Sequence, residues 1–500
     1  MNWPTRIALA LTSAAGLALA HPDADQGWLA WGLLAPLLVA VDGLPIRRAA
    51  LLGLAFGYAN ATFIYFWIFD LAGFGLQHAL VLGFVLAAYP ALFCAATVSL
   101  RHSRVPALLW LPCLWVALEF ARAHAGFLAF PWANLAHTQT HTPSWLQIAS
   151  VTGEAGVSFL IVLANAALAR AVLGRTNRRE LVAVAAVLAL CFGMGWRIAS
   201  TPLVGNELRV AVVQPNIPLD DPQTPAGLKA RFEKLRRLTR AAAEGGVDLV
   251  AWPETAVRGL AKTPALEAGV LELASELDAS LIVGSSDAEK LRPATRDREA
   301  VTERHNSAYH VQPNRRLAPP YHKMRLLPFG EYRPYEKWLS WPDWLVPRLF
   351  DIRAGREQSQ FTLADGTRFG VLICWENLFA SLARTSVRDG ARLLVHISND
   401  NWFGPTAEPR QHFGASVLRA VETGVPVLIA SNTGPSQIID GRGHRVAELP
   451  RLFEEGTLTA EIRIPRLSTP YVAAGDWFAW ACVAVCVFSA LAKARRHESA

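Results

Sequence analysis

The sequence predicts a helical membrane bundle of about eight spans joined to an α/β domain outside the membrane. Only 18% of its 500 residues are charged, 52% are hydrophobic and the mean hydropathy is +0.23. Because soluble proteins carry about 25% charged residues, part of the chain must lie in lipid. Long apolar windows gather before residue 200 and near the C-terminus, and strand-like runs alternate with helical ones between them. This pattern excludes a disordered, fibrous or simple cytosolic protein.

Apolar windows of about 20 residues with few charges predict seven membrane spans before residue 200 and one at the end. The eight spans are approximately 5–22, 27–44, 49–70, 78–100, 105–123, 154–173, 180–196 and 473–492. The first also has the pattern of a signal peptide, because Arg6 precedes an apolar run that ends in Ala18, Leu19 and Ala20. Cleavage there would leave an odd number of spans, so we expect the first helix to be retained.

The positive charges predict the orientation of the chain in the membrane. The net charge is +7, and basic clusters stand between apolar windows at 47–48, 101–104 and 170–179 and after the last window at 493–496. With eight spans these clusters fall on one side, which the positive-inside rule identifies as the cytoplasm. Both termini are then cytoplasmic and the segment 200–470 is extracytoplasmic. No basic run interleaves with aromatic residues on a soluble face, so nucleic acid is not an expected partner.

The segment 205–470 has the pattern of an α/β domain. Buried strands are expected at 208–214, 247–252, 280–284, 369–374, 392–398 and 426–431, and helices at 227–245, 267–277 and 411–422. Alternating strands and helices indicate a central sheet covered by helices. We therefore divide the chain into a membrane bundle at 1–200, an extracytoplasmic domain at 205–470 and a C-terminal membrane helix at 473–492.

One cysteine stands apart from the other five. Cys374 is the only cysteine outside the predicted spans, and it directly follows an apolar strand, where nucleophiles collect in α/β folds. It is either buried filler or a nucleophile. A nucleophilic thiol needs a base, and the carbonyl that it attacks needs an electrostatic partner. Glu254 can be the base and Lys323 the partner, although Glu254 could equally cap a helix and Lys323 could be a solvated loop residue.

Other polar residues give weaker signals. His322, beside Lys323, is a second candidate for the base, and His396 is expected to have a structural role in its strand. No ligand cluster such as H-E-x-x-H is present in the sequence to indicate a metal site.

A run rich in tryptophan and leucine lies between Lys323 and Cys374. It includes Trp338, Trp341 and Trp344, and so many exposed apolar side chains would be an aggregation hazard on a free soluble domain. Tryptophan is favoured at membrane surfaces. The run therefore indicates an arm near the bilayer, the alternative being a loop packed on its own core.

Three motifs, in this order, resemble the carbon–nitrogen hydrolase (nitrilase) superfamily. They are a Trp-Pro-Glu run ending at Glu254, a K-x-x-x-x-P-F-G-E-Y run beginning at Lys323 and an Ile-Cys-Trp-Glu-Asn run around Cys374. With seven spans before the domain and one after it, the whole chain resembles the apolipoprotein N-acyltransferases, membrane-embedded members of that superfamily. A Phe-Pro-Trp run ending at Trp132 is a further likeness. The resemblance implies a nitrilase-like α-β-β-α sandwich for the extracytoplasmic domain.

The resemblance also implies an activity, a ping-pong acyl transfer in the bacterial inner membrane with the catalytic domain on the periplasmic side. In that family a cysteine takes an acyl chain from a phospholipid, typically phosphatidylethanolamine, as a thioester. The N-terminal amine of a diacylglyceryl-cysteine apolipoprotein then receives the chain, in the last step of lipoprotein maturation. Carried onto this sequence, Cys374 is the nucleophile, Glu254 the general base and Lys323 the oxyanion stabiliser. No cofactor is needed, and we expect a monomer.

Further residues are carried over by position. Glu331 and Glu376 match acidic positions near the site, and the backbone N–H of Trp375 is expected to complete the oxyanion hole. The residues expected to contact lipid are Trp132, Trp338, Trp341 and Trp344.

The sequence departs from the family pattern in places. Val425 and Ile429 stand where arginines are usual, and His137 lies where a Gly-Tyr-Ser-Gln-like run would be expected. These differences leave the substrate preference open. A membrane-anchored amidase or nitrilase that hydrolyses a small envelope amide would use the same Glu-Lys-Cys triad, with water as the second nucleophile. A non-catalytic scaffold or transporter is a third interpretation.

Overall fold

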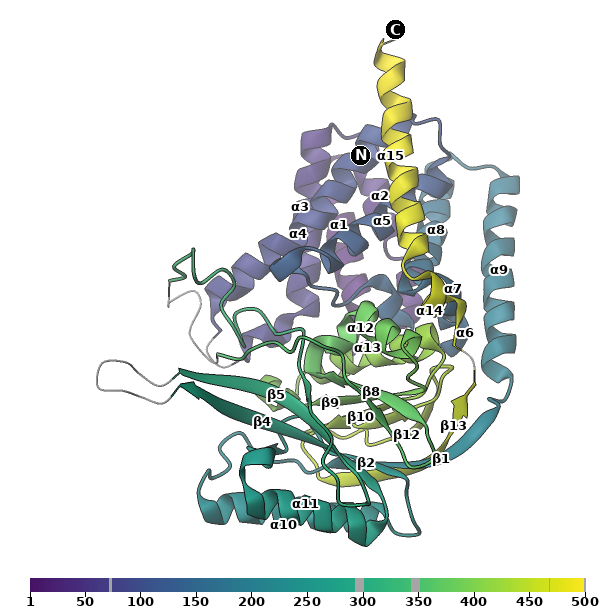
Figure 1. The fold of residues 1–500 in the computed structure, drawn as a ribbon. Helices are drawn as coiled ribbons and strands as arrows, with labels where there is room; N and C mark the ends of the chain where they lie inside the picture. Colours follow the sequence, from purple (N-terminus) through teal and green to yellow (C-terminus); the bar gives the residue numbers. More distant parts are fainter. Residues whose placement is uncertain (72–73, 293–300, 343–350, 467, 499–500) are drawn as a thin grey trace. The chain divides into compact units, whose positions relative to one another are not determined.

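The chain folds into two compact units, which Figure 1 colours along the sequence. The computed structural model describes residues 1–71, 74–292, 301–342, 351–466 and 468–498. The first unit consists of residues 1–201, 406–414 and 473–500, and the second of residues 202–405 and 415–472. The segment 406–414 thus belongs to the helical unit although the sequence places it in the α/β domain. Gln411 ties this segment to the helical unit, because its Nε2 donates to the carbonyl oxygens of Pro22 and Ile64, each at 3.0 Å.

The first unit is helical. Its helices of seven or more residues are α1 Trp3–Leu19, α2 Ala35–Val41, α3 Ile46–Ile64, α4 Leu76–Ser99, α5 Ala107–Ala123, α8 Glu154–Val172, α9 Arg178–Ser200 and α15 Trp477–Glu498, and the short α6 Pro143–Leu146 and α7 Ala149–Thr152 precede α8. Within the described residues, three helical segments are long and apolar enough to cross a membrane, at Leu76–His102, Glu154–Val172 and Arg178–Ser200. Shorter apolar segments lie at Gly27–Val41 and Trp477–Ala492.

Helix α9 has a surface that suits lipid. Only 6% of its apolar window is buried, against 61% for α8. A helix that is apolar all round and packs against so little protein is stable in hydrocarbon rather than in water. Its start is fixed locally by a capping box, in which Asn177 accepts from the backbone N–H of Glu180 at 2.9 Å.

The segment 27–44 differs from its prediction, because it is not one continuous helix. A 3₁₀ turn at Gly27–Trp31 is followed by the separate helix α2, which starts at Ala35 with a proline in its first turn. The side chain of Asn165 on α8 accepts from the backbone N–H groups of Leu34 and Ala35 at 2.8 and 2.9 Å. The break is tolerated because these donors, which a continuous helix would satisfy itself, find a partner inside the bundle.

The second unit contains two sheets. The first has the order β13-β1-β2-β4-β5-β6, with β3 beside β4, and the second has the order β12-β11-β10-β9-β8-β7. The strands are β1 Gly205–Gln214, β2 Leu249–Ala251, β3 Val257–Arg258, β4 Ser280–Arg292, β5 Val301–Val311, β6 Tyr321–His322, β7 Gln360–Thr362, β8 Arg368–Ile373, β9 Leu393–Ser398, β10 Val427–Ser431, β11 Gln437–Ile439, β12 Arg445–Glu448 and β13 Gly456–Pro465. All six predicted strands are confirmed.

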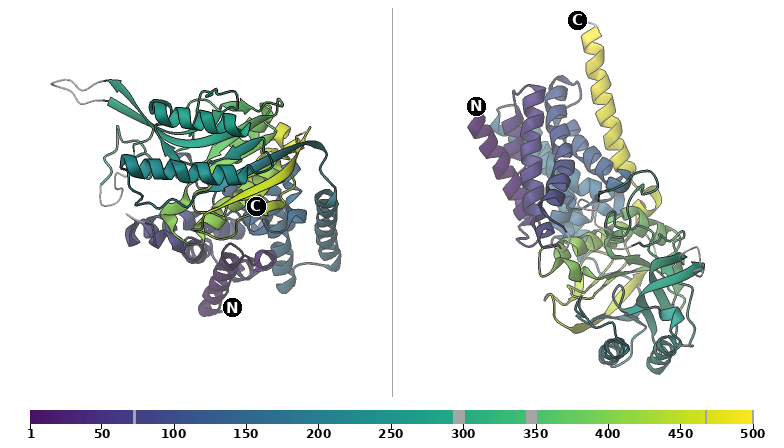
Figure 2. Two further views of the ribbon diagram at one scale, coloured as in Figure 1. Left: turned by 90° about the horizontal axis from the view of Figure 1, so that it is seen from below. Right: turned by 90° about the vertical axis from the view of Figure 1, so that its left-hand side faces the viewer.

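The two sheets stack face to face and helices cover their outer faces. Along β1, Val210 and Val212 point into the core between the sheets, whereas Ala211 and Val213 point toward α10 and α11. Figures 1 and 2 show these two helices side by side on the outer face of the first sheet. The helices are α10 Pro225–Ala242 and α11 Pro264–Leu277, with α12 Ala380–Arg388 and α13 Glu408–Thr423 beside the second sheet. The predicted α-β-β-α layering is confirmed, and α12 is an addition to the predicted elements.

The sandwich brings two strand ends to one place. Strand β2 is parallel to β1 and β4, and β8 is parallel to β9. Glu254 follows β2 and Cys374 follows β8, so each sheet contributes one predicted functional residue from the carboxyl end of a parallel strand. Ligands and reactive groups gather at this end in α/β sheets.

Candidate active site

The predicted nucleophile sits on a strained turn. Cys374 comes directly after β8 and begins a 3₁₀ turn that runs to Leu378. Its φ is +54°, in the left-handed region that costs an L-residue about 1–3 kcal/mol. Cys374 packs at the edge of the core between the sheets and is half-buried as a residue. Such strained backbone conformations are common at functional sites, where they direct a side chain toward a ligand.

The predicted base is held by two hydrogen bonds. Glu254 is buried, its Oε1 accepts from the Nδ2 of Asn306 at 2.5 Å, and its Oε2 accepts from the backbone N–H of Asn399 at 2.9 Å. Gly284 allows this loop to pack closely on β4, because a Cβ there would lie 2.1 Å from the carbonyl oxygen of Pro253. The carboxylate is therefore fixed in both position and rotation.

The predicted oxyanion stabiliser lies between two carboxylates. Lys323 follows β6, its backbone N–H donates to the carbonyl of Asn306 at 2.8 Å, and its side chain is 1% exposed. Its Nζ lies 2.8 Å from Oε1 of Glu331 and 3.7 Å from Oε1 of Glu254. The other oxygen of Glu331 accepts from the backbone N–H of Leu327 at 2.7 Å. Asn306 thus contacts both predicted residues, through its side chain and through its backbone.

The electrostatics of the three groups are coupled. Burial raises the pKa of Cys374 well above its ordinary value, and the negative charge of Glu254 raises it further, while Lys323 lowers it. Burial also raises the pKa of Glu254, against the lowering effect of Lys323. For Lys323, burial disfavours the cation, but Cys374, Glu331 and Glu254 outweigh it and raise the pKa well above the usual range. At neutral pH the sulfur is therefore a thiol that needs a base, beside a permanent ammonium ion.

Glu376 joins the lysine segment to the turn that carries Cys374. Its carboxylate accepts from the hydroxyl of Tyr321 and from the backbone N–H groups of Met324, Arg325 and Ile373, at 2.7 to 2.9 Å. Burial raises its pKa, and the hydrogen bonds from these backbone groups oppose that effect. With its acceptor positions used by structural donors, Glu376 holds the site together rather than exchanging protons with a substrate.

Trp375 is anchored behind the turn. Its indole Nε1 donates to the carbonyl of Arg325 at 2.6 Å, and its ring meets Phe379 edge-on with centroids 5.0 Å apart. The side chain is buried, so any contact with a substrate is left to its backbone. The guanidinium of Arg325 lies over the ring of Phe379, 5.2 Å from its centroid, so the segment that carries Arg325 contacts both Trp375 and Phe379.

The four tryptophans expected to contact lipid lie in different settings. Trp132 is buried in the first unit, where it stacks on His412 at 5.3 Å and donates to Gln411 at 3.3 Å. Trp338 is 83% exposed, as an interfacial arm requires. Trp341 donates to the carbonyl of Pro334 at 2.6 Å. Trp344 lies outside the described residues.

The structure adds partners that the sequence did not reveal. Asn306 and Asn399 both hold Glu254, yet Asn306 stands in an unremarkable strand sequence and Asn399 acts through its backbone. His322 makes a 2.9 Å contact with Ser307, and its ring lies 4.4 Å from that of His305. The fully buried His396 hydrogen-bonds to the carbonyl of Cys374.

The three departures from the family pattern are buried. Val425, two residues before β10, and Ile429, within β10, are both fully buried. His137 is 5% exposed, and its Nε2 lies 3.2 Å from Oε2 of Glu154. Their side chains are core or internal residues of their own units.

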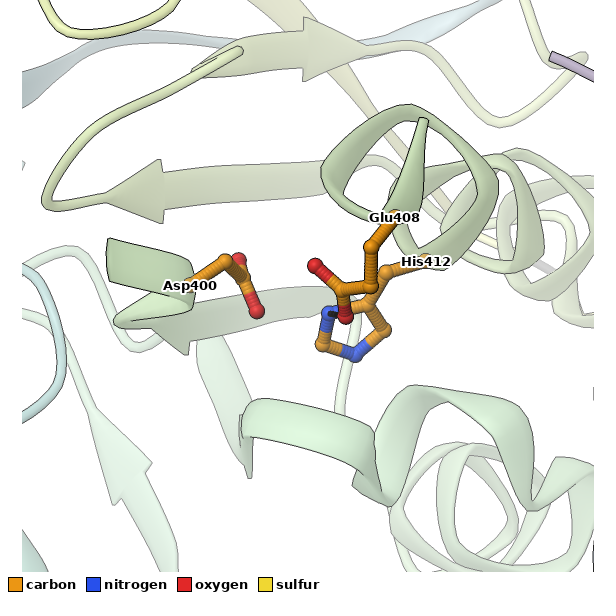
Figure 3. Close-up of side chains that lie close together, drawn as sticks. All are labelled: Asp400, Glu408 and His412. Carbon is orange, nitrogen blue, oxygen red and sulfur yellow. Dashed lines mark ion pairs between the residues drawn. The ribbon is translucent and has the colours of Figure 1, made fainter. Parts of the chain in front are cut away.

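Three further buried residues carry groups that can bind metals. Figure 3 draws Glu408 and His412 one turn apart on α13, with 3.8 Å between Oε1 and Nδ1, together with Asp400. Asp400 accepts from the hydroxyl of Ser398 at 3.1 Å. Because Asp400 belongs to the second unit and the other two residues to the first, we assign them to no common site.

Comparisons with known proteins cover both units. A family model described as carbon-nitrogen hydrolase matches residues 209–469, and one described as apolipoprotein N-acyltransferase N-terminal domain matches residues 13–167. An apolipoprotein N-acyltransferase of Geobacter metallireducens is 36% identical over 98% of this chain and 95% of its own. One of Methylococcus capsulatus is 32% identical over 98% of this chain and 97% of its own. Among solved structures, Saccharomyces cerevisiae Nit3 of the nitrilase superfamily is similar over 53% of this chain and 92% of its own, with a TM-score of 0.39 and 21% identity.

Replacing Glu376 tests its role as a link between segments. Glu376→Gln is expected to lower the free energy of unfolding by about 2–3 kcal/mol. The glutamine amide has one acceptor oxygen instead of two, and its NH₂ group would face backbone N–H groups that are themselves donors. Tyr321→Phe removes one donor only and should cost about 1 kcal/mol. Both are measured by thermal unfolding of the detergent-solubilised protein. The matched control is Glu276→Gln, an exposed partner of Arg240, which should have little effect. Equal losses for the two glutamate variants would contradict the assignment.

Proposed function

The chain belongs to the apolipoprotein N-acyltransferase family, and from this premise we propose that it transfers an acyl chain from a membrane phospholipid to the N-terminal amine of a diacylglyceryl-cysteine apolipoprotein. The acyl chain is carried between the two substrates as a thioester on Cys374. Phosphatidylethanolamine is the proposed donor and the enzyme acts as a monomer. The observation that carries the proposal is the meeting of the buried Glu254 and Lys323 with the half-buried, strained Cys374, each from a different strand end.

In the first half-reaction Glu254 acts as a general base. The Sγ of Cys374 attacks the ester carbonyl of the donor while Glu254 accepts the thiol proton, as the raised pKa of that thiol requires. The negative charge that forms on the carbonyl oxygen is stabilised by the ammonium of Lys323 and by the backbone N–H of Trp375. The carbon–oxygen bond then breaks, Glu254 returns its proton to the leaving oxygen, and a lysophospholipid departs.

In the second half-reaction the acceptor amine attacks the thioester. Glu254 takes one proton from the nitrogen as the carbon–nitrogen bond forms, and the same two donors stabilise the second oxyanion. The carbon–sulfur bond breaks and the proton passes from Glu254 to the sulfur, which restores the thiol. The products are an amide and the free enzyme, so each half-reaction returns every group to its starting charge.

Glu331 supports these steps by holding Lys323. A buried ammonium is stable only beside compensating negative charge, and the 2.8 Å pair with Glu331 supplies it independently of Glu254. Glu254 can therefore be protonated and deprotonated in each cycle while the position of Lys323 stays fixed.

The setting we propose for this chemistry is the bacterial inner membrane. The apolar helices of the first unit and the basic clusters between them support eight spans with both termini in the cytoplasm and the α/β domain on the periplasmic side. Such an arrangement presents the site to a lipid donor and to the lipid-bearing end of the acceptor. The exposed Trp338 supports an arm at the bilayer surface, and we propose Trp341 and Trp344 of the same sequence run as further candidates for acyl-chain contact.

Labelling of the thiol tests the proposed transfer directly. Purified enzyme incubated with a phospholipid that carries a labelled acyl chain should become labelled at Cys374, and a diacylglyceryl-cysteine peptide added next should take the label on its amine. Cys374→Ser should lose both steps, and Glu254→Gln should slow the first about 10²–10⁴-fold. The measurement is mass spectrometry of peptides, and Cys191→Ser is the matched control, expected to behave as wild type.

The same experiment separates the alternatives. Free fatty acid without peptide labelling would favour a membrane-anchored hydrolase that uses water as the second nucleophile. Transfer at the native rate by Cys374→Ser would overturn the nucleophile.

The pH dependence of acylation reports the state of Glu254. Only the carboxylate form can accept the thiol proton, and burial raises the pKa of Glu254 above its ordinary value of 4.5. Acylation is therefore expected to be lost as pH falls through that raised pKa, and to persist into alkaline solution because the pKa of Lys323 is well above 10.5. Single-turnover rates between pH 4 and 10 measure this. A rate that stays constant down to pH 4 would argue against Glu254 as the base.

Membrane topology has its own test. A reporter enzyme that works only outside the cytoplasm, fused after Leu203, should be active, whereas the same reporter fused after Arg48 should be silent. The opposite pattern would overturn the proposed orientation and the span count behind it.

A further inference from the structure

A buried histidine contacts the backbone of the nucleophile. His396 lies on β9, is fully buried, and pairs in register with Leu372 of β8, two residues before Cys374. Its Nε2 lies 2.8 Å from the carbonyl oxygen of Cys374. A carbonyl oxygen can only accept, so this nitrogen carries the proton.

A chain of hydrogen bonds fixes that proton. The Nδ2 of Asn377 donates to the Oγ of Ser416 at 3.0 Å, and this Oγ lies 3.0 Å from the Nδ1 of His396. Since the Ser416 oxygen already accepts from an amide, its own hydrogen is free to point at Nδ1, which then accepts as a neutral nitrogen. The chain runs from Asn377 through Ser416 and His396 to Cys374, every donor pointing toward the nucleophile, and it selects the Nε2–H tautomer.

The carbonyl of Cys374 and the N–H of Trp375 belong to one peptide group. In a planar trans peptide the two bonds point in opposite directions and cannot turn independently. Cys374 has a left-handed φ of +54°, a conformation that an L-residue rarely adopts without support from its surroundings. The peptide plane that follows therefore needs contacts to hold its orientation. A hydrogen bond that fixes the oxygen therefore also aims the N–H, and it polarises the peptide so that the N–H becomes a stronger donor.

We infer that His396 is a positioning residue for the oxyanion hole, which acts through the Cys374–Trp375 peptide group without touching the substrate. The inference rests on the proposed function, because it assumes that a carbonyl oxygen of the substrate becomes negative beside the N–H of Trp375. Ser416 and Asn377 serve the same end by holding the imidazole and its tautomer.

Two reactions of the same sulfur test this inference. Acylation of Cys374 by a phospholipid builds charge on a carbonyl oxygen, whereas alkylation of Cys374 by iodoacetamide displaces iodide and builds none. In the full-length protein, His396→Leu is expected to slow acylation about 10–100-fold, part of the loss expected for one missing oxyanion donor. Alkylation at Cys374 should keep its wild-type rate and pH profile. Both rates are followed by peptide mass spectrometry in the same samples.

Further variants separate positioning from folding. His396→Gln keeps an N–H at the same distance along the side chain and should recover most of the acylation rate, and Ser416→Ala should show a smaller loss than His396→Leu. The matched control is His310→Leu, which removes another buried histidine of the same unit, hydrogen-bonded to Ser280 at 3.1 Å. It should lower the melting temperature about as much as His396→Leu and leave acylation unchanged.

The outcomes divide cleanly. Parallel losses of acylation and alkylation in His396→Leu would overturn the inference, because they would mean that the histidine places the sulfur itself. Acylation at the wild-type rate in His396→Leu, or an equal acylation loss in His310→Leu, would also overturn it. If the wild-type enzyme forms no acyl-thioester, both the proposed function and this inference are wrong. If the wild type is acylated and His396→Leu is acylated at the same rate, only the inference is wrong.

Discussion

The buried charge of Lys323 is the constraint on which the site depends. An ammonium ion 1% exposed would be intolerable without negative partners, and Glu331 at 2.8 Å and Glu254 at 3.7 Å provide them. These partners come from a loop after β6 and from the end of β2, so the lysine draws separate segments into contact. The thiol beside them loses solvation and keeps its proton, so a base must take that proton before the sulfur can attack a carbonyl. The charges of Lys323, Glu254 and Glu331 therefore determine both how these segments pack and the protonation state of the thiol.

The sandwich converts this local arrangement into a rigid one. Glu254 leaves the first sheet and Cys374 leaves the second, and neither sheet alone could hold both. Glu376 ties the lysine segment to the turn of Cys374 through backbone donors, and Asn306 reaches Glu254 from β5. Glu254 and the backbone of Lys323 are thus both held by Asn306 of β5, so part of the site's geometry follows from the register of the first sheet.

Sequence patterns predicted the layers of the second unit and picked out Glu254, Lys323 and Cys374, which the structure brings together, because strand ends and motif residues are local signals. They did not predict Asn306 or the backbone N–H of Asn399, since these partners are set by the pairing of distant strands. The break at 27–44 was missed for a related reason: its orphan N–H groups are satisfied by Asn165, about 130 residues away. Strand β11 has three residues and the edge strand β12 has four, which is too short a run to carry a periodic signal.

The raised pKa of Cys374 also bears on how the sulfur survives. Thiolates, not thiols, react with peroxides and exchange with disulfides. A sulfur that stays protonated until a substrate and a base meet beside it presents little thiolate to such reagents. As Cys374 is also the single cysteine of its unit, no neighbouring thiol is present to trap it as an internal disulfide. The burial that raises the pKa of Cys374 therefore also protects its sulfur from these reagents.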